Sequence, residues 1–334
     1  MFRRDPLQQA IGDLQAVLGG DLRMVRPALR AALAHGGVVG AARGPHRVVR
    51  GLGGVPEDGV FELASVSKPF TAALAGALVN AGPLSWDAPL STLGGPLRPL
   101  PPFVTAWALA THTAGLPMHP ARVGVTSFTH VHDPYGTLSP AGVVGSVRRW
   151  ARPGGRFGYS NLGVGLLALA CAHAAGEAFT AEGFGEALTR GVTRPVGLTV
   201  TLRPGAGLVV PRPGLLTGPE VTRFGPLAGA GGLFGRAEDL LTFGQASLSG
   251  AAGTLHLGLE RPRGLPGGLD GVIPGWFARG ALRWHDGVAR GTRTGLGVNL
   301  ESGVVVTVLV RGGVPVLGVR AAVPAALLGL LGNA

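Results

Sequence analysis

The spacing of hydrophobic positions changes along this chain and predicts where its helices and strands lie. Over residues 7–18, apolar side chains recur at helical intervals, which indicates an amphipathic helix. Two short apolar runs follow at 37–42 and 48–52, on either side of Gly44-Pro45, and they predict two strands joined by a hairpin. Residues 61–64 are expected to be extended.

The spacing becomes strand-like again near the end of the chain. Residues 276–284, 293–300 and 303–310 indicate three consecutive antiparallel strands, with a turn before the last one. Residues 321–331 are almost wholly apolar and predict a closing helix. Strands near both ends of the chain therefore favour a single sheet that both ends assemble.

The region between these strands mixes Pro- and Gly-rich loops with helical patterns. A helix is expected from about residue 65 to 81, and Pro69 is tolerated there because amides of the first turn have no intrahelical acceptor. Further helical patterns lie near 140–150, 161–175, 180–190 and 236–248. We predict an α/β fold in which an antiparallel sheet carries a helical insertion.

The composition is that of a folded protein with a sizeable core. The chain has 334 residues, of which 46% are hydrophobic and 14% charged. Its net charge of +11 would suit nucleic acid, but the arginines are scattered and no basic run is interleaved with aromatic residues. We therefore expect a solvated basic surface and no nucleic-acid partner. The one cysteine, Cys171, lies in an apolar run and is expected in the core.

No segment has the pattern of a secretory signal or a membrane span. The residues after Met1 lack an apolar stretch, and the longest apolar runs, 162–172 and 321–332, fall short of the roughly 20 residues that cross a bilayer. We expect a cytoplasmic protein without a membrane partner.

Lys68 is the only lysine among the 29 Lys and Arg residues, and it follows Ser65 by three positions. An arginine cannot lose its proton in a protein, whereas a lysine can when burial depresses its pKa. On a helix, positions i and i+3 share a face, so the Lys68 amine would lie near the Ser65 hydroxyl. This favours a serine nucleophile whose base is not histidine. The alternative is a helix N-cap followed by a solvated lysine.

A second candidate segment is Tyr159-Ser160-Asn161. The chain has 2 tyrosines beside 12 phenylalanines, so a phenol here is selected for its hydroxyl. The segment ends a turn-rich loop that leads into the predicted helix 161–175, and it can project Tyr159 and Asn161 towards Ser65. The alternative is a structural tyrosine with Asn161 as the helix cap.

A third candidate segment is His285-Asp286-Gly287, at the end of a predicted strand. Gly287 would allow a ligand to approach the backbone closely, and the amide of Val288 would be a donor to an oxyanion. The alternative is a surface hairpin turn made by Asp-Gly.

These three segments, in this order, resemble the serine β-lactamase and penicillin-binding-protein superfamily. The resemblance is to its class C-like branch, which holds β-lactamases, DD-peptidases, D-aminopeptidases and family VIII esterases. Residues 61–68, 109–117 and 229–233 are similar to further segments of that branch. The resemblance covers roughly residues 30–312.

This resemblance implies a β-lactamase/transpeptidase-like fold, with an antiparallel sheet flanked by terminal helices beside an all-helical domain. On this basis we assign residues 1–64 and 266–334 to the α/β sheet domain and residues 65–265 to the mainly helical domain. The active site is expected at their junction.

The resemblance also implies the roles of site residues. Ser65 would be the acylated nucleophile, and Lys68 and Tyr159 would share the proton transfers, with either of them as the base. Four further positions are expected to bind substrate or the oxyanion: Asn161, His285, Gly287 and Val288. His285 would replace the family's alternative lysine as the hydrogen-bonding partner of the Tyr159 hydroxyl. Asp286 departs from the usual Thr or Ser and would repel a substrate carboxylate.

Together these features predict a serine hydrolase that forms an acyl-enzyme with a small ester or amide, most similar to a carboxylesterase. A D-amino-acid peptidase or amidase is one alternative, because Asp286 would attract a substrate ammonium, and a β-lactamase is another. A sensor or scaffold that is acylated without turnover is the alternative of another class. We expect no cofactor and no metal, although residues 129–133 carry a His-x-His-Asp pattern that superficially resembles zinc ligands.

Overall fold

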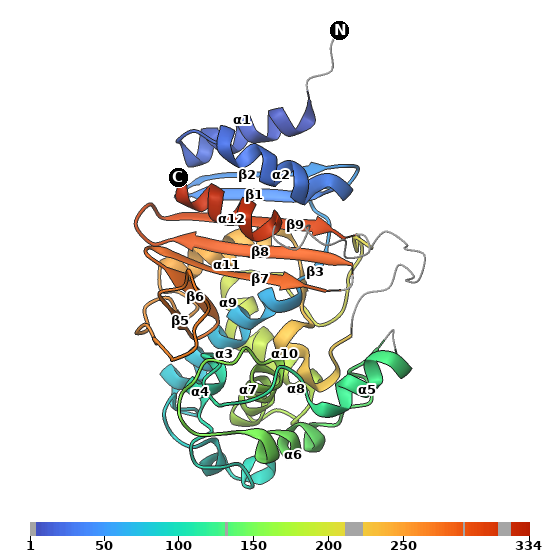
Figure 1. The fold of residues 1–334 in the computed structure, drawn as a ribbon, viewed down its shortest axis with the longest axis vertical. Coiled ribbons are helices and arrows are strands. Elements are labelled where there is room, and N and C mark those ends of the chain that lie inside the picture. The colour runs from blue at the N-terminus through green and yellow to red at the C-terminus, as the bar shows by residue number, and fades with distance from the viewer. Residues whose placement is uncertain (1–4, 131–132, 211–222, 290, 313–321) are drawn as a thin grey trace.

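The computed structural model describes residues 5–130, 133–210, 223–289, 291–312 and 322–334. Its main feature is a seven-stranded antiparallel sheet with the order β2-β1-β9-β8-β7-β6-β5 (Figure 1). The strands are β1 (Gly37–Arg43), β2 (His46–Leu52), β5 (Gly271–Ile273), β6 (Trp276–Arg279), β7 (Leu282–Val288), β8 (Thr292–Asn299) and β9 (Val304–Arg311). Because β1 pairs with β9, both ends of the chain build one sheet, as predicted.

Two sequence expectations about the last strands were wrong. The predicted strand 276–284 is two strands, β6 and β7, because Gly280 between them adopts a left-handed backbone with φ 52° and turns the chain. Strand β7 continues past Trp284, so Asp286 and Gly287 pair with β8 and do not form the surface hairpin turn considered as an alternative.

The sheet separates two hydrophobic cores. Along β9, Val306 and Val308 belong to one core, whereas Val305 and Leu309 belong to the other. Alternate side chains of a strand point to opposite faces, so a strand buried on both faces is apolar throughout. Helices α1 (Pro6–Leu18), α2 (Arg26–Ala32) and α12 (Ala322–Gly332) cover one face, and α11 (Ala237–Leu248) packs on the other (Figure 1).

The remaining helices form the second half of the molecule, below the sheet in Figure 1. They are α3 (Ser67–Ala81), α4 (Ala106–Ala110), α5 (Ala121–Thr129), α6 (Pro140–Trp150), α7 (Asn161–Ala174), α8 (Ala181–Leu188), α9 (Arg194–Val196) and α10 (Ala228–Gly231). The sequence pattern predicted α1, α3, α6, α7, α8, α11 and α12 and missed α2, α4, α5, α9 and α10. Short strands β3 (Phe61–Glu62) and β4 (Phe234–Gly235) pair with each other near the sheet.

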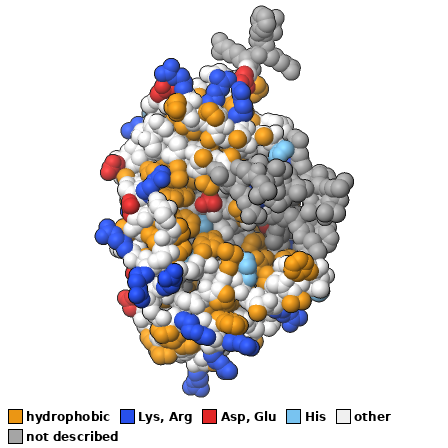
Figure 2. Space-filling view, viewed as in Figure 1, with side chains coloured by type: hydrophobic (Ala, Val, Ile, Leu, Met, Phe, Trp, Pro, Cys, Tyr) orange, Lys and Arg blue, Asp and Glu red, His pale blue; other side chains and the backbone are white. Residues whose placement is uncertain are grey.

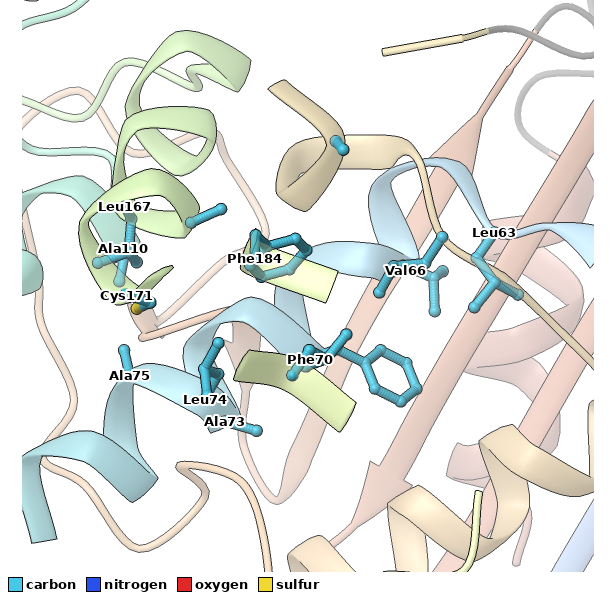
Figure 3. Packing of buried hydrophobic residues seen from close by; sticks show 14 of the residues in the cluster. Leu63, Val66, Phe70, Ala73, Leu74, Ala75, Ala110, Leu167, Cys171 and Phe184 are labelled. Carbon is cyan, nitrogen blue, oxygen red and sulfur yellow. The ribbon is translucent and has the colours of Figure 1, made fainter. Parts of the chain in front are cut away.

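Helix α7 lies at the centre of this helical half. It is apolar all round and contacts α3, α4, α6, α8 and α10, which is expected of a helix without a solvent face. Figure 3 shows Leu167 and Cys171 of α7 near Ala110 of α4 and Ala75 of α3. Cys171 is fully buried, which confirms the predicted core position. The domain boundaries at 64/65 and 265/266 stay a prediction.

The cationic side chains are dispersed over the face shown in Figure 2, between hydrophobic and neutral groups. This dispersal follows from their scatter along the sequence. Within the described ranges, the helices fall short of the length and hydropathy that a membrane-crossing helix requires.

Candidate active site

Ser65 lies in a single turn of 3₁₀ helix, Ala64–Val66, that leads directly into α3. Helix α3 begins at Ser67, two residues later than expected. Ala64 has a φ of 49°, a left-handed conformation that non-glycine residues adopt only where neighbouring structure holds them. Such support comes from β8, where Thr294 Oγ1 donates to the Leu63 carbonyl at 2.7 Å. The turn that carries the hydroxyl is therefore fixed by the sheet.

Lys68 is 1% exposed, and its amine meets three oxygen atoms. Nζ lies 3.0 Å from Ser65 Oγ, 2.8 Å from Asn161 Oδ1 and 2.7 Å from the Ala230 carbonyl oxygen. Burial lowers the pKa of Lys68 well below its usual value, and the charge of Asp286 opposes this only in part. A solvated lysine after an N-cap, the alternative considered for this motif, is thus wrong.

The hydrogen-bond inventory of a neutral Lys68 amine fixes the direction of its lone pair. Such an amine has two N–H groups and one lone pair. The Asn161 and Ala230 oxygens are acceptors only, so they take both N–H groups. The lone pair then faces the Ser65 hydroxyl, which has a proton to donate. This is the arrangement that a general base requires.

The Tyr159 hydroxyl donates to Ser65 Oγ at 2.8 Å. Burial raises the pKa of Tyr159 above its usual value, and its hydrogen bond to Ser65 opposes the rise. The Lys68 amine also lies 4.8 Å from the centre of the Tyr159 ring. The phenol therefore keeps its proton at neutral pH and donates it to Ser65 Oγ.

His112 holds the loop that presents Tyr159. Its carbonyl accepts from the Gly158 amide at 2.9 Å, and its Nδ1 accepts from the Ser160 amide at 3.2 Å. Burial lowers the pKa of His112 to about 3, so the ring stays neutral and keeps this acceptor. His112 is buried, as expected of a structural histidine. The cap of α7 is Ser160, whose Oγ accepts from the Gly163 amide, and not Asn161, as the alternative for this segment supposed.

His285 lines the site from β7 and is 2% exposed. Its Nδ1 donates to the Asp286 carbonyl at 2.9 Å, so in the neutral ring the lone pair sits on Nε2. Nε2 has no hydrogen-bond partner within the described part of the chain. Burial lowers the pKa of His285 well below its usual value. The expected hydrogen bond between His285 and the Tyr159 hydroxyl was wrong: the hydroxyl bonds Ser65 Oγ, and the centres of the two rings lie 6.1 Å apart.

Gly287 allows β7 to lie against the nucleophile turn. A Cβ at this position would come within 2.3 Å of Thr294 Oγ1 and 2.7 Å of the Leu63 carbonyl oxygen. The glycine is therefore required by the close approach of two protein segments, and the expected approach of a ligand to its backbone stays a prediction. Val288 follows with an exposed side chain. Its amide as an oxyanion donor stays a prediction.

Asp286 adds a carboxylate to the charges around the site. Its side chain is half-buried, burial raises its pKa, and the charge of Lys68 lowers it. The same carboxylate raises the pKa values of Lys68 and Tyr159, so all three groups interact electrostatically.

Sequence reasoning missed two groups of this site. One is the Ala230 carbonyl, which lies in a segment that supported the family resemblance without being given a role. The other is Tyr135, a buried phenol whose pKa burial raises and an interaction with the Asn161 side chain lowers. The signal available in the sequence was the scarcity of tyrosine, since Tyr135 is one of 2 in the chain. In the pattern at residues 129–133, His132 lies outside the described residues.

Comparison with known proteins agrees with this geometry. The profile of the Beta-lactamase family matches residues 23–330. The D-alanyl-D-alanine-carboxypeptidase/endopeptidase AmpH of Escherichia coli K12 is 30% identical over 152 residues, which is 43% of this chain and 37% of that protein. The alignment thus spans little more than a third of the length of this curated relative.

Two solved structures share the fold over nearly the whole chain. A beta-lactamase/D-alanine carboxypeptidase from Yersinia pestis, complexed with citrate, superposes with a TM-score of 0.72 at 18% identity and covers 98% of this chain and 99% of its own. A D-stereospecific amidohydrolase from Streptomyces sp. gives 0.70 at 20% identity, with 92% and 99% covered. The profile match, together with this shared β-lactamase/transpeptidase fold, establishes that the chain belongs to the Beta-lactamase family of serine hydrolases.

Proposed function

We propose that this protein hydrolyses a small ester or amide through an acyl-enzyme at Ser65. The observation that carries the proposal is the buried Lys68 amine, which lies 3.0 Å from Ser65 Oγ and whose pKa burial lowers well below its usual value. A serine is a weak nucleophile until a neighbouring base takes its proton. Lys68 meets this requirement, whereas the raised pKa of Tyr159 makes a phenolate base unfavourable.

The proposed reaction has two halves. Lys68 Nζ accepts the Ser65 proton while Oγ attacks the substrate carbonyl carbon, and the carbonyl electron pair moves to the oxygen. The amides of Ser65 and Val288 would hold that oxyanion. The oxyanion then re-forms the carbonyl as the bond from its carbon to the leaving oxygen or nitrogen breaks, and the leaving alcohol or amine takes the proton, directly from Lys68 or through the Tyr159 hydroxyl. Water repeats the sequence on the acyl-enzyme, which releases the acid and restores the neutral amine.

The substrate we favour is an ester without a carboxylate beside the scissile bond. Asp286 places a carboxylate close to the reacting groups. It would repel a carboxylate of the substrate, because like charges repel strongly where water is partly excluded. β-Lactams and peptides ending in D-alanine carry such a carboxylate. This argument supports a carboxylesterase-like activity over β-lactamase or carboxypeptidase activity.

A second candidate is an amidase for D-amino-acid derivatives. The same Asp286 carboxylate that repels an anion would attract the ammonium group of an amino-acid amide. One of the structural relatives is described as a D-stereospecific amidohydrolase. The two candidates differ in whether a positive charge on the substrate increases kcat/KM.

The deciding experiment compares purified wild type with Ser65→Ala on a substrate panel. The panel holds p-nitrophenyl acetate and butyrate, D- and L-amino-acid p-nitroanilides and a chromogenic cephalosporin. We expect ester turnover that Ser65→Ala abolishes and that the matched control Ser249→Ala, at an exposed serine, retains. Faster turnover of the D-amino-acid p-nitroanilides would favour the amidase.

Two outcomes would count against the enzyme. Activity that persists in Ser65→Ala would overturn the assignment of the nucleophile. A fluorophosphonate or activated ester that labels Ser65, together with a stable acyl adduct from every substrate and no product release, would support the sensor instead. The substrate assays measure the first outcome, and intact-protein mass spectrometry detects the label and the adduct of the second.

A further inference from the structure

Helix α5 carries its large apolar side chains on its solvent side. Ala121, Val125 and Phe128 are spaced i, i+4 and i+7, so they form one stripe along the helix. Such a stripe normally faces the core, but the buried residues of α5 are Val123 and Thr126. Val125 is 63% exposed and Phe128 86%. A contiguous exposed apolar stripe of this kind indicates a contact surface.

A groove of about 370 Å³ lies between α5 and α6 and extends this stripe. Helix α5 lines it with Ala121, the first residue of the stripe, and with Arg122. The residues that α6 contributes are Gly142, Gly145, Ser146, Arg149 and Trp150. The guanidinium carbon of Arg149 lies 5.2 Å from the centre of the Trp150 ring. Small residues therefore leave space in the groove, and two arginines and an indole border it.

The chain around the groove is strongly cationic. Between Asp87 and Glu177 the sequence holds six arginines and a single carboxylate, Asp133. All six arginines are exposed, whereas Asp133 is half-buried. Figure 2 shows cationic groups among hydrophobic ones in the lower, helical half of the molecule. A positive surface with few carboxylates attracts an anionic partner.

We propose that the α5–α6 surface, formed by the stripe and the groove, docks on the anionic surface of a lipid bilayer. Val125, Phe128 and Trp150 enter the boundary between headgroups and acyl chains, where such side chains are favoured. Arg122 and Arg149 contact lipid phosphates while their hydrocarbon stems lie along the apolar groups. A surface contact needs no membrane-spanning helix, and it departs from our expectation of no membrane partner.

Two arguments favour a bilayer over a protein partner. A second copy of the chain would bring Arg122 and Arg149 of both copies into one two-fold contact, where like charges repel. A specific protein interface takes roughly 20–30 residues from each side, far more than this stripe and groove supply. A bilayer requires only protruding apolar side chains with cations beside them.

The α5–α6 surface lies next to the candidate active site along the chain. Just before α5, the Met118 carbonyl accepts from the amides of Asn161 and Leu162 at 2.9 and 3.2 Å, at the start of α7. Docking therefore brings the loop beside the site close to the bilayer. The inference goes beyond the proposed function and does not depend on hydrolysis at Ser65.

The test is co-sedimentation of the full chain with lipid vesicles. Vesicles of phosphatidylcholine are compared with vesicles that also hold about 30% phosphatidylglycerol, at about 0.1 and 0.5 M NaCl. At low salt we expect at least about fivefold more protein on the anionic vesicles, and most of it should be released at high salt. The double variants Val125→Ser/Phe128→Ser and Arg122→Gln/Arg149→Gln should each reduce this binding at least about fivefold.

Matched controls lie in the other half of the molecule. Met24→Ser, just before α2, removes an apolar side chain that is 84% exposed. Arg26→Gln/Arg30→Gln removes two positive charges from α2, where both guanidinium groups contact Asp5 at the surface. Both controls should bind the vesicles like the wild type, and circular dichroism confirms that every variant is folded.

Equal binding to both kinds of vesicle, or binding to neither, would overturn the inference. An equal loss in Arg26→Gln/Arg30→Gln would do so too, because net charge alone would then explain the binding. Sedimentation velocity without lipid tests the rival occupant: a dimer that Val125→Ser/Phe128→Ser dissolves would assign the surface to a second copy instead. None of these outcomes affects the proposed function, which fails only if Ser65→Ala stays active.

Discussion

The carbonyl oxygen of Ala230 lies 2.7 Å from Lys68 Nζ and takes one of the two protons of the neutral amine. It belongs to a contact between α10 and α3. The adjacent Gly229 carbonyl accepts from Thr71 Oγ1 at 2.7 Å, and the Leu233 amide donates to Ser67 Oγ at 3.1 Å. Three side chains of one helix thus bond the backbone of a distant segment. This contact, together with Asn161, sets the direction of the amine.

Replacing Lys68 with arginine should remove catalysis although the positive charge is kept. A guanidinium has no lone pair to accept the Ser65 proton and does not deprotonate in a protein. We expect kcat/KM for p-nitrophenyl butyrate to fall at least about 100-fold, the scale of a lost general base. Steady-state kinetics measures this, with circular dichroism to confirm folding. Arginine with more than about a tenth of wild-type activity would exclude Lys68 as the base.

Replacing Lys68 with methionine should change how stability depends on pH. The folded-state pKa of Lys68 lies well below the usual value of 10.5, so between these two values the unfolded chain binds a proton that the folded chain does not. The wild type therefore gains stability as pH rises through this window, by about 1.4 kcal/mol for each pH unit. Methionine has no such dependence.

The expected result is a difference in melting temperature, Lys68→Met minus wild type, that is largest near pH 6 and shrinks towards pH 10. The variant also loses the hydrogen bonds from Lys68 to Asn161 and Ala230. This loss changes the difference in melting temperature by the same amount at every pH and leaves its slope against pH unchanged. Differential scanning calorimetry across this range measures it. A difference that is flat with pH would show that Lys68 is not buried as a neutral amine.

Much of this site was predictable because its residues follow from local rules. Ser65 and Lys68 are spaced for one face of a helical turn, and a solitary lysine and a scarce tyrosine mark groups chosen for their protons. The strands β1, β8 and β9 were predicted from their apolar runs. Each of these features depends on the identity of a side chain or on the spacing of residues that are close in the sequence.

What the sequence did not show depends on contacts between distant segments. The Ala230 carbonyl is a backbone atom, so its place beside Lys68 leaves no trace in residue type. Gly287 is a glycine because the Leu63 backbone lies against it, and no local sequence pattern predicts that contact. The break between β6 and β7 depends on the left-handed φ of Gly280. The residues on both sides of this glycine suit a strand, so the pattern over 276–284 predicted one continuous strand.

Replacing Gly287 with alanine should destabilise the protein and displace the nucleophile turn. The added methyl group would lie 2.7 Å from the Leu63 carbonyl oxygen and 3.0 Å from Ala64 Cβ, just before Ser65. Overpacking of this kind costs about 1–3 kcal/mol. We expect a lower midpoint of urea unfolding and a loss of esterase activity larger than the loss of stability explains.

The matched control is Gly12→Ala. Gly12 lies inside α1, far from the site in sequence, with no atom within 4 Å of an added Cβ. Alanine should raise stability there by about 0.5–1 kcal/mol, because glycine is the poorer helix former. If Gly287→Ala also leaves stability and activity intact, the close packing of β7 on the nucleophile turn is not needed for the site.

Replacing Asp286 with threonine should change which substrates are accepted. Threonine removes the carboxylate that interacts with Lys68 and Tyr159, so an incoming substrate carboxylate is no longer repelled. Relative to p-nitrophenyl butyrate, we expect turnover of a chromogenic cephalosporin to rise at least about tenfold and that of a D-amino-acid p-nitroanilide to fall.

In the wild type, the burial that raises the pKa of Asp286 implies that acidification weakens this discrimination as the carboxyl gains a proton. Asp58→Asn, at an exposed carboxylate, is the control and should leave the ratios unchanged. If Asp286→Thr also leaves them unchanged across pH, substrate charge is selected elsewhere, and the argument that favours neutral esters over β-lactams fails.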